Sequence, residues 1–101
     1  MGERTGVAEA RAAWEAALEE SWRADQEFRA AGDELMRLGL EPAGPADAPG
    51  LPARLERLRQ LDEEFRAAGR RATEAVHRQF AAARRLREAE GAGVTTDHQG
   101  A

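Results

Sequence analysis

The placement of the prolines constrains the fold of this chain more than any other feature. All four lie between Pro42 and Pro52, in the segment GLEPAGPADAPGLP that begins at Gly39, and long stretches without proline flank it. Proline removes a backbone donor and clashes with the preceding turn, so a helix interior excludes it. The sequence therefore predicts two long helices joined by a turn.

Glycine and proline also predict where the helices end. Gly39 can supply the left-handed residue of a Schellman-type stop, after which Pro42 prevents continuation. Pro52 is tolerated in the first turn of a helix, where its missing N–H is not needed. The expected organisation is a disordered N-terminus 1–6, a helix 7–38, a Pro/Gly-rich turn 39–51, a helix 52–90 and a flexible tail 91–101.

Both expected helices carry a heptad repeat. The a positions of the first include Val7 and Phe28, those of the second include Leu58 and Phe65, and alanine predominates at d in both. Arg54 is a polar exception near the start of the second seam. A sustained 3.5-residue repeat is typical of coiled coils. We expect one all-α domain, an antiparallel two-helix hairpin that completes a four-helix bundle by self-association.

Folding the chain back at the turn predicts a register. Phe28 should lie level with Phe65, and alanines of the two seams should face each other between the larger residues. Small residues on both seams allow the helices to approach at the short end of the ~8–10 Å range. We therefore expect close packing of the two helices.

The g positions of the two helices carry charges that face each other in an antiparallel pair. Glu34 should meet Arg57 and Glu20 should meet Arg71, whereas Glu27 would face the like-charged Glu64. Each exposed favourable pair contributes only ~0.2–1 kcal/mol. These charges are expected to select orientation more than to add stability.

A short repeated segment occurs in both expected helices. The segment DQEFRAAG at 25–32 recurs as DEEFRAAG at 62–69, with seven of eight residues identical. Convergence on one helical pattern and duplication of a single-helix unit both explain this. In either case both helices present the same motif.

The e and b positions form an apolar flank that a two-helix structure leaves uncovered. Such a patch marks an interface on a soluble protein. We expect a second copy or a helical partner to dock there, and the alternative is that these side chains merely lie along the groove of the hairpin. The expected interface residues are Trp14, Leu18, Trp22, Gly32, Met36, Gly69, Val76, Phe80 and Ala83.

Composition excludes several classes of site. The chain has no cysteine, so disulfides, thiolate nucleophiles and cysteine-bound zinc are ruled out. A net charge of −4 with acids interspersed among the arginines makes nucleic acid an unfavoured partner. No segment has the roughly 18 uninterrupted apolar residues of a membrane span, so a cytoplasmic protein is expected. Arginine without lysine suggests a GC-rich bacterial genome.

Glu74 and His77 form a Glu-x-x-His pair, which resembles half of a ferritin-like di-iron site that dimerisation could complete. Metal ligands in such a site must point into the bundle, yet these residues occupy c and f positions, which face away from the seam. A solvated helix face is the favoured interpretation, with no metal or cofactor. With no phosphate loop or cleft to assemble either, we expect a non-enzymatic interaction protein.

In its length, two helices, tight turn and tail, the chain resembles the WXG100 class of small secreted helical hairpins. The Trp-x-Gly motif that names the class is absent from the turn, Gly39 to Pro52, and the chain has no tyrosine for a Tyr-based export signal. The resemblance is one of architecture. It implies a secreted helical effector, exported without a signal peptide, as an alternative function.

Overall fold

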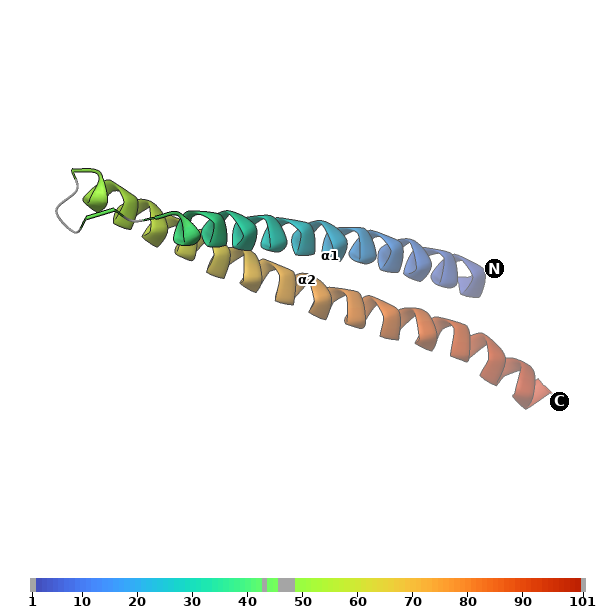
Figure 1. Ribbon diagram of the computed structural model, residues 1–101. Coiled ribbons are helices and arrows are strands. Elements are labelled where there is room, and N and C mark those ends of the chain that lie inside the picture. The colour runs from blue at the N-terminus through green and yellow to red at the C-terminus, as the bar shows by residue number, and fades with distance from the viewer. Residues whose placement is uncertain (1, 43, 46–48, 101) are drawn as a thin grey trace. The chain divides into compact units, whose positions relative to one another are not determined.

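A computed structural model shows two helices, α1 from Gly2 to Leu40 and α2 from Leu51 to Gly100 (Figure 1). It describes residues 2–42, 44–45 and 49–100, with side chains for 6–42, 44–45 and 49–91. Within these residues there is no strand. The all-helical fold, with two helices packing against each other, is therefore confirmed.

The chain divides into two compact units, each built from one stretch of α1 and one of α2. The turn unit comprises residues 23–72 and contains the connection between the helices. The terminal unit comprises residues 1–22 and 73–101.

In the turn unit, the rings of Phe28 and Phe65 stack between the helices. Their centroids are 4.8 Å apart and their planes differ by 18°. Offset stacking at this distance is a favourable arrangement of two aromatic rings. The contact confirms the antiparallel register that the heptads predict for this pair.

Gly32 and Gly69 make room for these two rings. A Cβ added at Gly32 would lie 3.0 Å from Cε1 of Phe65, and one added at Gly69 would lie 3.2 Å from Cε1 of Phe28. Each phenyl ring thus covers the glycine of the opposite helix, four residues beyond the other phenylalanine. The repeated FRAAG segments pack on each other reciprocally.

Alanine fills the space between the helices of the terminal unit. Ala17, Ala75 and Ala82 are buried, and Ser21 is the buried polar residue there. Small side chains at the d positions let the two backbones come close. The turn unit shares this feature at Ala68, and Leu61 is buried there as well.

The predicted helix stop at Gly39 is wrong. α1 continues to Leu40. Among the described residues, the glycine with a positive φ is Gly44, at 73°. The change of direction that was assigned to Gly39 therefore takes place further along the connection. Gly39 lies in the last turn of α1, where glycine lowers helix stability but still adopts a helical backbone conformation.

Arg54 closes the C-terminal end of α1 from the opposite helix. Its Nη1 donates a hydrogen bond to the carbonyl of Pro42 at 3.0 Å, and its Nη2 donates to those of Leu38, at 2.8 Å, and Glu41. The last carbonyls of a helix lack partners within the helix. A guanidinium at an otherwise apolar seam position thus satisfies them and interacts favourably with the negative end of the helix.

The outer boundaries also differ from the prediction. α1 begins at Gly2 rather than near residue 7, and α2 extends to Gly100 rather than ending at Gly91. A single glycine lowers helix stability by about 1 kcal/mol and does not by itself end a helix. Met1, Ala101 and residues 43 and 46–48 of the predicted turn lie outside the described residues.

Candidate interaction surface

Ion pairs between g positions connect the two helices within each unit. In the turn unit, Arg57 lies 3.1 Å from Glu34, as predicted, and Arg71 lies 4.0 Å from Glu27. In the terminal unit, Arg78 donates to Glu20. The g positions of the two helices therefore lie on one side of each unit, and the e positions lie on the other.

The predicted pairing of Glu20 with Arg71 is wrong. The two g-position glutamates that precede Glu34 each pair with an arginine one heptad further along α2 than a strict register would give, Glu27 with Arg71 and Glu20 with Arg78. This choice gives Glu27 an opposite charge in place of Glu64. Long arginine side chains can reach along the seam, so charge complementarity decides the partner.

The apolar flank is exposed in the terminal unit. Trp22 and Phe80 have 67% and 60% of their surfaces accessible, while Leu18 and Val76 are half-buried. We call these four residues the Trp22 face. Trp14 and Ala83, also predicted for the interface, are half-buried too. Apolar patches exposed on a protein surface often mark sites where another molecule binds.

The remaining predicted interface residues belong to the turn unit. Met36 is 64% exposed. Gly32 and Gly69 instead pack against phenyl rings of the same chain, so their small size needs no external partner. The sequence prediction omitted Leu55 from the interface, although this e-position residue is also largely exposed.

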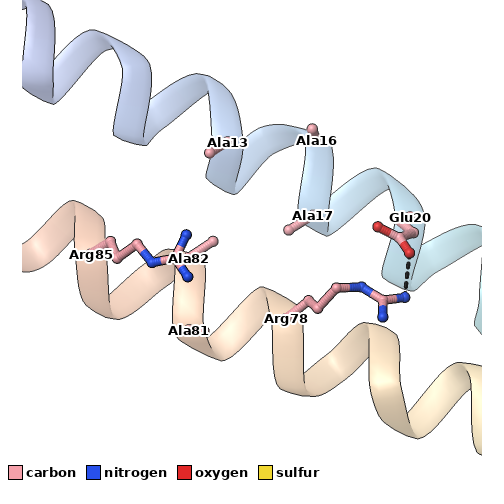
Figure 2. Close-up of a pocket in the computed structure, with 8 residues that line it drawn as sticks. All are labelled: Ala13, Ala16, Ala17, Glu20, Arg78, Ala81, Ala82 and Arg85. Carbon is pink, nitrogen blue, oxygen red and sulfur yellow. Dashed lines mark hydrogen bonds and ion pairs between the residues drawn. The ribbon is translucent and has the colours of Figure 1, made fainter.

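A groove lies on the g side of the terminal unit (Figure 2). It has a volume of 290 Å³ and was not predicted from the sequence. The sequence feature that could have indicated this groove is a pair of adjacent alanines at the c and d positions of each helix. Its lining residues are Ala13, Ala16, Ala17, Glu20, Arg78, Ala81, Ala82 and Arg85. Of its three charged lining residues, Arg78 donates a hydrogen bond to Glu20, and Arg85 is the third.

The Glu74 and His77 side chains are both exposed. Among the described residues, no three histidine, cysteine or carboxylate side chains come close enough together to hold a metal ion. A metal bound by two exposed side chains would keep most of its water ligands.

No family model matches the chain, and neither a search of curated proteins nor one of solved structures finds a match. Within the described part of the chain, neither helix has the length and hydropathy needed to cross a membrane.

Proposed function

We propose that this chain is a non-enzymatic interaction protein that self-associates through the Trp22 face. The observation that supports this most is the exposure of Trp22 and Phe80 within one unit. Tryptophan and other aromatic residues supply much of the binding energy at protein interfaces. A helical pair that leaves two of them in water gains stability when another helical surface covers them.

The size of this face suits a dimer that forms a four-helix bundle. At their observed exposures, the four aromatic rings of two copies would bury roughly 400–600 Å². Specific interfaces bury at least about 1,200 Å² in total. The aromatic residues thus provide a large share of the minimum area, and surrounding alanine, leucine and valine surface can supply the rest.

The test is the mass of the protein in solution, measured by light scattering for the natural chain and for Trp22→Glu. A buried carboxylate without a partner is strongly unfavourable, so the variant should be monomeric where the natural chain is dimeric. Leu40→Glu is the matched control, because Leu40 is 79% exposed and lies at an f position. It should leave the dimer mass unchanged.

A natural chain that is monomeric at micromolar concentration would contradict self-association. A dimer that persists in both Trp22→Glu and Phe80→Glu would show that another surface forms the interface. Circular dichroism of each variant, with helix content equal to that of the natural chain, separates loss of association from loss of folding.

A further inference from the structure

The turn unit carries four charged residues in a repeated arrangement. Arg29 Nε lies 2.8 Å from Asp25, and Arg66 Nε lies 3.0 Å from Asp62, both as i,i+4 pairs. These are the equivalent residues of the two repeated segments, 25–32 and 62–69. The aspartates occupy e positions and the arginines b positions, on the side opposite the g-position ion pairs.

The antiparallel register places these charges in an alternating pattern. Because Phe28 stacks on Phe65, Asp25 lies within about 3 Å of the level of Arg66 along the helix axes, and Arg29 lies equally near the level of Asp62. Each aspartate therefore pairs with an arginine of its own helix and lies near the level of the arginine of the other helix. We call these four residues the Asp/Arg square.

We propose that the Asp/Arg square is the site where a second copy of this chain docks and is aligned. A two-fold axis that runs along the helices brings Asp25 of one copy opposite Arg66 of the other. This aligned arrangement matches opposite charges, whereas a crossed arrangement places like charges together.

The partner follows from this symmetry. The square, with two positive and two negative charges in alternation, has no net attraction for a uniformly acidic or basic surface. It is complementary to its own copy, and an isologous dimer requires that property. The exposed Met36 and Leu55, at b and e positions of the same unit, add apolar contact area.

This inference rests on the proposed self-association and specifies what aligns the two copies. Exposed ion pairs contribute little to the folding of a single chain, ~0.2–1 kcal/mol each. Opposed charges at an interface act more strongly on which partner binds and in which orientation. The square is therefore expected to control pairing rather than folding.

A charge exchange tests the inference. In the basic variant, Asp25→Arg and Asp62→Arg leave four arginines in the square. In the acidic variant, Arg29→Asp and Arg66→Asp leave four aspartates. Each variant alone should be monomeric at concentrations where the natural chain is dimeric, and an equimolar mixture should recover the dimer mass.

The control is Asp33→Arg combined with Glu63→Arg, which makes the same change in net charge as the basic variant. Both residues are exposed and occupy f positions, away from the square. This control should keep the natural dimer mass. Unchanged mass in the basic and acidic variants, or no recovery in their mixture, would overturn the inference.

The two proposals can fail separately. If Trp22→Glu abolishes association while the charge exchange has no effect, self-association stands and the square has no part in it. If the natural chain is monomeric at all concentrations, both proposals are contradicted. Recovery of mass only in the mixture supports the square, because no change in overall solubility produces that result.

Discussion

In the turn unit two phenyl rings fill the space between the helices, whereas in the terminal unit alanines fill it. The rings of Phe28 and Phe65 face glycines, so large and small residues alternate across the seam. In the terminal unit Ala17, Ala75 and Ala82 are buried and the large aromatic residue Phe80 is exposed. The first arrangement fixes register by shape, and the second brings helices close while leaving apolar surface available for a partner.

The largest expected effect is the loss of the stacked pair. Phe65→Ala should lower the free energy of unfolding by about 2–3 kcal/mol, somewhat below the 3–5 of a fully buried phenylalanine, because Phe65 is half-buried. Urea unfolding followed by circular dichroism measures this at a concentration where the protein is monomeric. Phe80→Ala, in the terminal unit, should cost less than about 1 kcal/mol. Equal losses of stability in Phe65→Ala and Phe80→Ala would contradict the difference in packing between the two units.

Enlarging an alanine tests how closely the helices of the terminal unit approach. Ala75 is 1% exposed, so Ala75→Leu should destabilise the chain by about 1–3 kcal/mol through overpacking. Ala12→Leu is the control on an exposed position of the same unit and should change stability by less than about 0.5 kcal/mol. A stabilised Ala75→Leu protein would show that the helices have room to spare there.

Removing the cap at the end of α1 should have a smaller effect, confined to the turn unit. Arg54→Ala removes the guanidinium donors of three carbonyls, of which only that of Leu38 keeps a backbone donor, and should lower the free energy of unfolding by about 1–2 kcal/mol. Arg59→Ala removes only an exposed i,i+3 ion pair with Glu56 and should cost about 0.5 kcal/mol or less. A loss for Arg54→Ala no greater than that for Arg59→Ala would argue against the cap.

The smallest expected effect compares two glycines of α1. Gly39→Ala should stabilise the chain by about 0.5–1 kcal/mol, because a Cβ there meets nothing within 4 Å. At Gly32 the same Cβ would lie 3.0 Å from Phe65, so the repulsion should offset the gain in helix propensity. Thermal unfolding of both variants measures the difference. Equal stabilisation would mean that the phenyl ring moves aside freely.

Sequence reasoning located the elements and the register well. The prolines separate the two helices, and the heptads place Phe28 opposite Phe65, as the structure shows. These features depend on local backbone chemistry and on a side-chain period that repeats along one helix. The helix ends were predicted less well, because glycine weakens a helix without deciding where it stops.

A heptad pattern predicts which face of a helix a residue lies on but not which atoms of the other helix lie next to it, and this limited the interface prediction. The heptads indicated an apolar flank but could not separate exposed Trp22 from Gly32, whose neighbour is a ring of the opposite helix. They also gave no sign that Arg54, a polar residue in the seam, would bind carbonyls of the other helix. Both depend on atoms distant in sequence.

The sequence by itself determined that this chain forms two amphipathic helices, that they pair in an antiparallel direction, and that Phe28 meets Phe65. The effect of proline and the helical period are local properties of the chain, so both can be predicted from the sequence alone. Only the tertiary structure decided which arginine each glutamate binds, what the glycines accommodate and which aromatic residues stay in water. Those outcomes depend on the distance between helices and on the reach of long side chains, which no single segment encodes.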